Sequence, residues 1–218
     1  QLEEGSELTE YTPSVETFDS RASSATYVDD ATGLIKTTPV NLIKHSQDFS
    51  AINWANRRTV DSVTTETLDP LGGSTATKLL DTTDNNTHRI DKVLPGGTLS
   101  ANTTYTLSVF AKQAEYSLVS LTIGENSNVY GRVTFDLNAG VKSSESAGYT
   151  GFIESAGGGW YRCIATVTLP SSVANQNSLI GLLPDASTPS FAGTGTSGVY
   201  IWGAQLEEGT TATPYIKT

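Results

Sequence analysis

The clearest structural signal in this chain is the stretch Thr104-Tyr105-Thr106-Leu107-Ser108-Val109-Phe110-Ala111-Lys112. Every second residue from Tyr105 to Ala111 is apolar or aromatic, and the residues between them are mostly polar. A period of two indicates a β-strand, because successive side chains point to opposite faces of a sheet. We therefore expect a strand here with Leu107 and Val109 in the core and a wetter opposite face.

Short apolar runs separated by Gly and Asn clusters continue along the chain, and only 17% of the residues are charged. This composition is typical of an all-β sandwich or barrel. The alternation after Trp160 places Cys163 and Val167 in the core, and Ile180 lies in another such run. Cys163 is interpreted as a core residue, because a nucleophilic thiolate would need a basic partner. Ten strands are predicted: Arg58–Thr65, Ala76–Asp81, His88–Leu94, Tyr105–Lys112, Leu118–Gly124, Gly131–Leu137, Gly151–Ser155, Trp160–Leu169, Ser178–Leu182 and Val199–Leu206.

The two ends of the chain are versions of one segment. Gln1-Leu2-Glu3-Glu4-Gly5 recurs as Gln205-Leu206-Glu207-Glu208-Gly209, and residues 1–14 agree with 205–218 at seven of fourteen positions. This predicts that residues 1–20 are the end of a preceding repeat and a linker, in an array of modules. We expect residues 1–14 and 205–218 to share one conformation, because identical junctions solve identical docking problems.

Between the linker and the main domain, residues 21–40 form a predicted β-hairpin connector. Ala25–Val28 and Leu34–Thr37 are β-prone runs that flank a short polar loop ending in Gly33. An isolated two-stranded ribbon is marginal in water, so this element needs a neighbour or a symmetry mate. The remaining residues, 41–218, form the predicted sandwich domain.

Charge and hydropathy argue against two classes of partner. The net charge of −10 and the pI near 4.5 disfavour nucleic acid, whose phosphates would be repelled. No stretch approaches the roughly 20 apolar residues of a membrane span, so no membrane insertion is expected. The single cysteine allows neither an intrachain disulfide nor a cysteine zinc site.

The residue types of catalytic sites are present only in unsuitable arrangements. His45-Ser46-Gln47-Asp48 contains the residues of a triad, but sequence neighbours do not hydrogen-bond in series, and a capped turn explains them. Glu207 and Glu208 are adjacent on a strand and so point to opposite faces, unlike a glycosidase acid and base. We therefore expect no enzymatic activity.

One oxygen-rich loop is the candidate for a metal site, and no other cofactor is expected. It contains Asp81, Asp84, Asn85 and Asn86, and calcium favours six to eight oxygen ligands. The spacing matches no defined calcium loop. Turn formation by Asp and Asn is the competing explanation.

Four segments of the chain occur together in one class of domain: Asn41-Leu42-Ile43-Lys44-His45-Ser46-Gln47-Asp48-Phe49 followed by Trp54, Thr104–Lys112, Gly159-Trp160-Tyr161-Arg162, and Val199-Tyr200-Ile201-Trp202-Gly203-Ala204-Gln205-Leu206-Glu207-Glu208-Gly209. They resemble the jelly-roll domains of bacteriophage tail-fibre and other virion surface proteins, which are similar in turn to carbohydrate-binding modules of families four and nine. The resemblance covers residues 41–218, and residues 21–39 resemble the hairpin that often precedes such a module. It implies an all-β, two-sheet antiparallel jelly-roll sandwich, no catalysis, and a place on the virion.

Sugar-binding modules need aromatic platforms and nearby polar groups. Trp160 and Trp202 are better explained by packing, whereas Trp54 is open to either role. Basic and aromatic residues concentrate near predicted strand ends, where they form either a glycan-binding surface or scattered salt bridges: Arg57, Arg58, His88, Arg89, Tyr116, Tyr130 and Arg132. From these we expect at most weak sugar binding, through Trp54 with Arg57, Tyr116, Tyr130 or Arg132.

The sequence therefore favours a structural and binding module of a phage tail fibre that contacts host-surface glycan. Its partners would be further copies of itself, as a homotrimer, or other virion proteins, and its location would be extracellular. A carbohydrate-binding module of a secreted bacterial glycoside hydrolase is the first alternative. A fibre depolymerase, which needs two carboxylates about 5–10 Å apart in a groove, is the second.

Overall fold

The computed structural model describes residues 26–28, 35–64, 66–124, 131–173, 176–185 and 188–218. The chain divides into two compact units, residues 1–40 and 41–218. In the first unit, β1 (Thr26–Val28) and β2 (Ile35–Thr37) pair antiparallel, with Thr26 opposite Thr37. The predicted hairpin is therefore confirmed. Among the residues that the structure describes, none forms a helix with the length and hydropathy of a membrane span.

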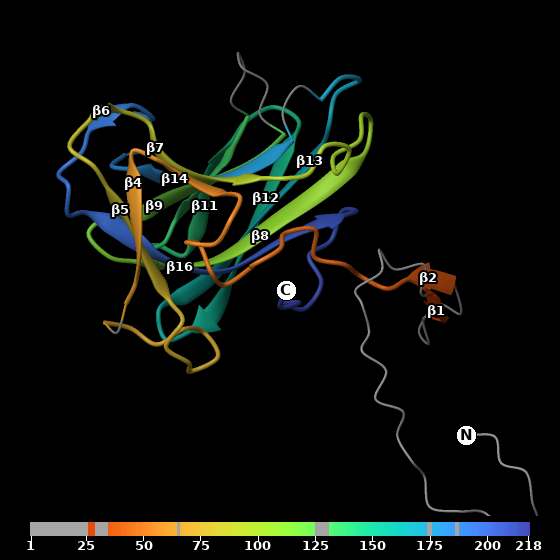
Figure 1. Ribbon diagram of the computed structural model, residues 1–218, viewed down its shortest axis with the longest axis horizontal. Coiled ribbons are helices and arrows are strands. Elements are labelled where there is room, and N and C mark those ends of the chain that lie inside the picture. The colour runs from red at the N-terminus through yellow and green to blue at the C-terminus, as the bar shows by residue number, and fades with distance from the viewer. Residues whose placement is uncertain (1–25, 29–34, 65, 125–130, 174–175, 186–187) are drawn as a thin grey trace, which may run out of the picture. The chain divides into compact units, whose positions relative to one another are not determined.

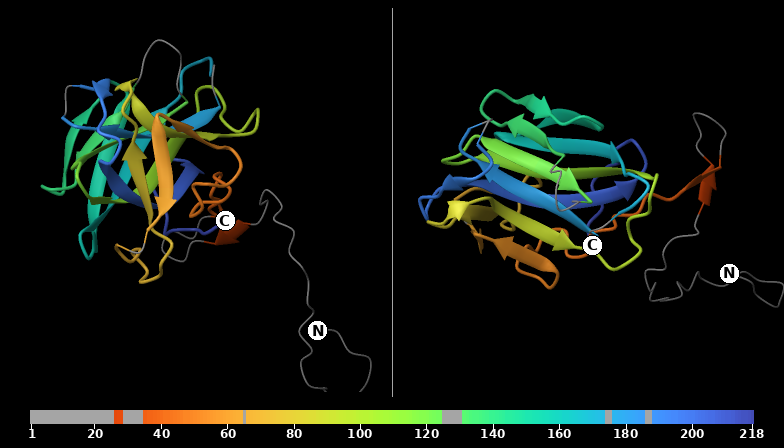
Figure 2. Two further views of the ribbon diagram at one scale, coloured as in Figure 1. Left: turned by 60° about the vertical axis from the view of Figure 1, so that its left-hand side comes forward. Right: turned by 90° about the horizontal axis from the view of Figure 1, so that it is seen from above.

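The second unit is a jelly-roll sandwich of two six-stranded antiparallel sheets (Figures 1 and 2). Sheet I has the order β11-β10-β9-β14-β7-β3, and sheet II has the order β12-β13-β8-β16-β5-β4. The short strands β6 (Asn85–Asn86) and β15 (Phe191–Ala192) pair with each other. The strands of sheet I are β3 (Trp54–Arg57), β7 (His88–Val93), β9 (Leu118–Ile123), β10 (Val133–Asp136), β11 (Val141–Glu145) and β14 (Asn177–Leu183). The strands of sheet II are β4 (Thr59–Val63), β5 (Thr77–Asp81), β8 (Thr104–Gln113), β12 (Tyr149–Gly157), β13 (Trp160–Thr168) and β16 (Gly198–Glu208). The predicted fold class is confirmed.

The core lies between the two sheets and is built from the inward residues of each strand. Leu107 and Val109 of β8 are buried there, as are Cys163 and Val167 of β13 and Ile180 of β14. All five were predicted from alternation alone. The turn between β12 and β13 uses Gly157, Gly158 and Gly159, each with positive φ, a conformation that L-residues with side chains rarely adopt.

The outer face of β8 was predicted to be wetter, and this is wrong. Thr106 and Ser108 point outward yet are buried, because the C-terminal residues 209–218 fold back over sheet II. Thr106 Oγ1 donates to the carbonyl of Gly209 at 2.8 Å, and Ser108 Oγ accepts from Arg162 Nη2 at 3.0 Å. At Thr106 and Ser108 the outer face of β8 is therefore polar but shielded from solvent.

Four residues hold this C-terminal segment to sheet II, and we call them the tail network: Gln205, Glu207, Thr213 and Tyr215. Gln205 Nε2 donates to Glu207 Oε2 at 2.7 Å, and the same carboxylate oxygen accepts from the backbone N–H of Thr213 at 3.1 Å. The ring of Tyr215 packs 4.7 Å from that of Trp202, and its hydroxyl is hydrogen-bonded to Ser46 Oγ.

The tail network gives a physical meaning to the repeated segment. Its members occupy positions that residues 1–14 share with residues 205–218, where the counterparts are Gln1, Glu3, Thr9 and Tyr11. In the C-terminal copy, the shared residues are those that hydrogen-bond and pack with one another. The expected likeness of the two segments falls on residues outside the described part of the chain and stays a prediction, as do the boundaries at residues 20 and 40.

Two edge strands of the sandwich, β3 and β11, were not predicted. The sequence of β11 is Val-Lys-Ser-Ser-Glu, and all five side chains are exposed, so it carries no apolar alternation. Strand β3 spans only four residues after the positive-φ residue Asn53. Strand β3 pairs with β7, and β11 pairs with β10. Both strands form because of this pairing, which leaves little signal in the local sequence.

Glu207→Ala should lower the free energy of unfolding by about 2 kcal/mol or more, because it leaves a buried amide and a backbone N–H without their charged acceptor. The adjacent and exposed Glu208→Ala is the matched control and should change it by less than about 0.5 kcal/mol. Urea unfolding measures both. Equal effects of the two substitutions would contradict the tail network.

Candidate functional site

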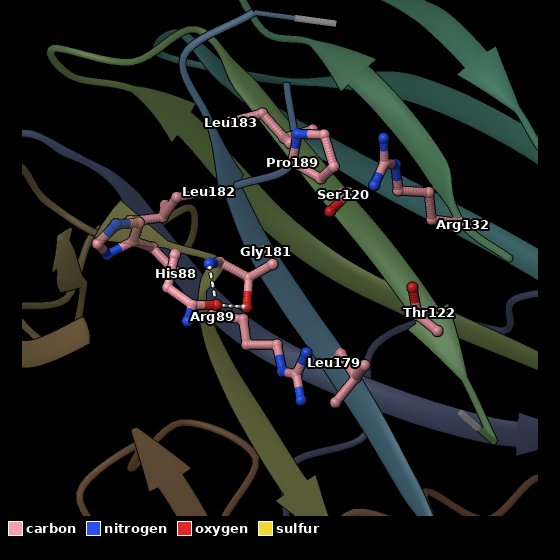
Figure 3. Close-up of a pocket in the computed structure, with 12 residues that line it drawn as sticks. His88, Arg89, Ser120, Thr122, Arg132, Leu179, Gly181, Leu182, Leu183 and Pro189 are labelled. Carbon is pink, nitrogen blue, oxygen red and sulfur yellow. Dashed lines mark hydrogen bonds between the residues drawn. The ribbon is translucent and has the colours of Figure 1, made fainter. Parts of the chain in front are cut away.

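A pocket of about 210 Å³ lies on the outer face of sheet I, where Gly181 interrupts the layer of side chains (Figure 3). In the sheet register, Gly181 of β14 lies between Arg89 of β7 and Ser120 of β9. Ile180 points into the core, so Gly181 faces outward and supplies no side chain to fill the space. A Cβ built at Gly181 would lie 2.6 Å from Ser120 Oγ. We call this pocket the Gly181 hollow.

The lining of the Gly181 hollow combines three kinds of group. Hydroxyls come from Ser120 and Thr122, guanidinium groups from Arg89 and Arg132, and aliphatic surface from other strand and loop residues, namely Leu179, Leu183 and Pro189. Figure 3 shows Arg132 on one side of Ser120 and Gly181 and Arg89 on the other. Of the described residues that line the hollow, none is Asp or Glu.

The two hydroxyls of the floor are held below the surface without protein partners. Ser120 is 8% exposed and Thr122 is 6% exposed. Within the described part of the chain, neither side chain has a hydrogen bond, and neither oxygen is sealed from solvent. Because buried polar groups are normally satisfied, these hydroxyls are available to a molecule that enters the hollow.

Asp91 organises the arginines at one side of the hollow. Its Oδ1 accepts from Arg89 Nε at 3.0 Å, and its Oδ2 accepts from Arg57 Nε at 3.2 Å. The carboxylate is almost fully buried, whereas Arg57 is more than half exposed. One strand beyond Arg89, Arg57 therefore lies beside the hollow but not among its lining residues.

His88 lines the hollow, but both of its ring nitrogens contact backbone carbonyl oxygens and so are not available to a ligand. The residue is 1% exposed, and its ring packs 4.5 Å from the ring of Phe191. Its Nδ1 lies 2.6 Å from the carbonyl oxygen of Arg58, and its Nε2 lies 3.1 Å from those of Asp84 and Phe191. In Figure 3 the ring points away from Gly181.

The structure disperses the residues predicted to bind sugar. Arg132 lines the Gly181 hollow and Arg57 lies beside it, whereas Trp54 and Tyr116 do not line it. Tyr130 lies outside the described residues. The structure therefore joins Arg132 not to the predicted aromatics but to Arg89, which was in the wider basic and aromatic group.

Trp54 is a packed residue and offers a restricted platform. Its ring lies 4.8 Å from that of Phe49 and 4.8 Å from Lys92 Nζ, and its Nε1 donates to the carbonyl of His45. Trp160 and Trp202 are buried on the outer side of sheet II, which confirms their structural role.

Tyr116 belongs to a network around Asp81. Its hydroxyl donates to Asp81 Oδ2 at 2.7 Å, and burial together with this hydrogen bond to a carboxylate raises the pKa of Tyr116 to about 12. Asp81 also accepts from the backbone N–H groups of Thr194, Gly195 and Ser197. Burial opposes its ionisation, but these donors outweigh that effect and lower the pKa of Asp81.

This network decides the geometry of the candidate calcium loop. Asp81 is directed at N–H and O–H donors of the 193–198 loop, while Asp84 accepts from Thr82 Oγ1 at 2.7 Å. Among the described residues, no three His, Cys, Asp or Glu side chains gather as metal ligands do. Asp81 ends β5, and Asn85 and Asn86 form β6, so Asp84 is the only one of these four residues that lies in the connecting bend.

The residues of the apparent triad are likewise used in packing. Ser46 is hydrogen-bonded to Tyr215 rather than to His45, and Asp48 accepts from the backbone and hydroxyl of Ser50.

Burial raises the pKa of the Cys163 thiol and so opposes thiolate formation.

Sequence reasoning missed the floor of the hollow: Ser120, Thr122, Leu179 and Gly181. Ser120 and Thr122 lie in the predicted strand Leu118–Gly124, where polar residues alternate with apolar ones as on the solvent-facing side of any strand. Gly181 carried the one usable signal, since a glycine inside a strand marks a bulge or a place that another molecule approaches closely.

Comparisons with known proteins give a fold-level likeness only. No protein-family model matches the chain, and no curated protein matches its sequence. One similar solved structure is described as a "putative sugar binding protein" from Bacteroides thetaiotaomicron; it is 12% identical, and the match covers 78% of this chain and 100% of that one with a TM-score of 0.41. A likeness this distant carries no argument about function.

Lys92 beneath Trp54 provides a pH test of this part of the structure. Burial lowers the pKa of its amine from 10.5 to about 8, against a smaller opposing effect of Asp48. Between those values the unfolded chain binds more protons than the folded one, so stability should rise as pH rises from 8 toward 10.5.

Lys92→Met should therefore remove this rise and be relatively most stabilising near pH 7. The exposed Lys44→Met is the control and should leave the wild-type profile unchanged. Denaturant unfolding at several pH values between 7 and 9.5 measures the difference. Parallel profiles for wild type and Lys92→Met would show that the amine is not buried as described.

Proposed function

We propose that this chain is a non-catalytic carbohydrate-binding module and that the Gly181 hollow receives a saccharide unit. The observation that carries the proposal is the pair of unpartnered, nearly buried hydroxyls of Ser120 and Thr122 at the floor of a hollow that exists because residue 181 is glycine. Because both oxygens are open to solvent and have no protein partner, a polar ligand can take the place of water at both of them.

The chemistry of the walls suits a sugar. A pyranose offers hydroxyls around its rim and C–H groups on its faces. Ser and Thr hydroxyls both donate and accept, and guanidinium groups donate, so the polar walls match sugar hydroxyls. Leu179 and Pro189 provide aliphatic surface for the C–H groups.

Weak binding is part of the proposal. The hollow is smaller than the roughly 300–1,000 Å³ of drug-sized sites, and its described lining contains no Trp, Tyr or Phe for stacking. A few hydrogen bonds and aliphatic contacts support an affinity near the millimolar level, about −4 kcal/mol.

The absence of catalysis is likewise proposed. Glycoside hydrolysis uses two carboxylates that flank the scissile bond, and the described lining offers none. Asp91, the neighbouring carboxylate, is held by Arg57 and Arg89. This arrangement favours binding over hydrolysis.

The proposed setting is the surface of a phage virion, as a tail-fibre segment that contacts host glycan and assembles as a trimer. Its support is the resemblance of the four sequence segments, and light scattering tests the trimer. A module appended to a secreted glycoside hydrolase would use the same hollow in the same way.

Screening the full chain on a glycan array, followed by ligand-observed NMR on the best binder, tests the proposal. Gly181→Val should abolish binding, because its side chain fills the hollow while a rotation of Ser120 Oγ relieves the close contact. Gly96→Val, at an exposed glycine with open space around it, should bind as wild type.

Two further variants keep the test decisive. Thr122→Val preserves shape and should weaken binding even if Gly181→Val folds poorly, and Trp54→Ala should leave binding within about twofold. Binding that survives Gly181→Val and Thr122→Val but is lost in Trp54→Ala would place the site elsewhere. Release of reducing sugar ends would overturn the non-enzyme proposal.

A further inference from the structure

Two arginines, Arg89 and Arg132, line opposite sides of the Gly181 hollow, and none of the described residues of its lining is acidic. We propose that the hollow selects acidic saccharides and that the guanidinium of Arg132, with Arg89 opposite, receives the carboxylate of a uronate unit. This inference rests on the proposed function and names the substrate class of the same site.

The local charge is the reverse of the charge of the whole chain. The chain carries a net charge of −10, yet Arg57, Arg89 and Arg132 lie in or beside the hollow, where the carboxylate of Asp91 binds the first two. A cationic hollow in an acidic protein attracts an anionic group locally while the remaining surface repels it. The local field therefore favours a ligand that carries its negative charge at one point.

Arg132 is the residue best placed to bind that charge. Its backbone is fixed by two hydrogen bonds with Ser146, one from Arg132 N–H to Ser146 Oγ at 3.1 Å and one from Ser146 N–H to the Arg132 carbonyl at 2.9 Å. Its guanidinium has neither a hydrogen bond nor an ion pair within the described part of the chain. Such a group presents a planar fork of donors that matches a carboxylate.

Arg89 is a positioned charge on the opposite wall. The ion pair from its Nε to Asp91 Oδ1 fixes the direction of the side chain. The same carboxylate holds Arg57, so Asp91 acts as a positioning residue for both. In a partly desolvated hollow, the field of Arg89 adds to the attraction exerted by Arg132.

The floor of the hollow explains why the ligand is a sugar acid rather than a simple anion. The hydroxyls of Ser120 and Thr122 can hydrogen-bond to the hydroxyl groups of a sugar ring, and Leu179 supplies an apolar contact beside them. A free carboxylate such as acetate would satisfy Arg132 but leave these groups without partners. A uronate satisfies both the charge and the floor.

The test compares each sugar acid with its neutral parent: glucuronate with glucose, and galacturonate with galactose. Ligand-observed NMR on the full chain should give at least about tenfold tighter binding of the acidic member in a pair that binds. Raising NaCl from about 50 to 500 mM should weaken the acidic member and leave the neutral one within about twofold.

Arg132→Gln should remove the tenfold preference, because the amide can still donate to sugar hydroxyls but carries no charge for the carboxylate. Arg132→Lys, which keeps the charge but not the fork, should retain part of the preference. Arg58→Gln, at an exposed arginine that does not line the hollow, is the matched control and should bind as wild type. Thermal unfolding of each variant establishes that the fold is retained.

The outcomes separate this inference from the proposed function. Equal binding of acidic and neutral members, unchanged in Arg132→Gln, would overturn acid selectivity and leave a saccharide-binding module standing. Binding of acetate as tight as that of the uronates would overturn the sugar part of the inference. No binding by any member of the pairs, and none on the glycan array, would overturn both.

Discussion

The docking of the C-terminal residues 209–218 on the outer face of sheet II is the constraint on which the rest of the structure depends. A two-sheet sandwich has two outer faces, and a polar strand such as β8 normally turns one side to water. Here the buried carboxylate of Glu207 and the ring of Tyr215 tie the segment across that face. Sheet II is thus covered on both sides, and the pocket described above lies on the outer face of sheet I.

The same constraint explains how the aromatic residues are used. Trp202 packs against Tyr215 and Phe110 beneath the docked segment, and Trp160 lies in the same cluster. Trp54 packs against Phe49 and Lys92 at the edge of sheet I. With all three tryptophans engaged in packing, recognition at the Gly181 hollow depends on hydroxyls, guanidinium groups and aliphatic contacts.

The fold could be predicted where alternation is strong and burial decides the register. The inward residues of β8 and β13 follow from a period of two, because a shift by one residue would place Thr106 in the core in place of Leu107. The cover over the outer face could not be predicted, because Thr106 and Ser108 have the same polarity whether they meet water or Arg162 and Gly209. Edge strand β11 left no signal because its exposed residues bury no apolar surface.

The site was predictable only in part, for a related reason. Arg132 and Arg57 stood out as basic residues in an acidic chain, and they do lie in or beside the hollow. Gly181, Ser120 and Arg89 come from three strands and meet only through the register of sheet I, which local sequence does not specify. The aromatic criterion led instead to Trp54 and Tyr116, which the tertiary structure uses to pack against Phe49 and Phe191.

The most direct test of the account is to map, by backbone amide NMR on the full chain, where a saturating saccharide binds. The account predicts that the largest shifts fall on Ser120, Thr122 and Gly181, with smaller shifts at Arg89 and Arg132. Shifts concentrated around Trp54 and Tyr116, or on the outer face of sheet II, would contradict it.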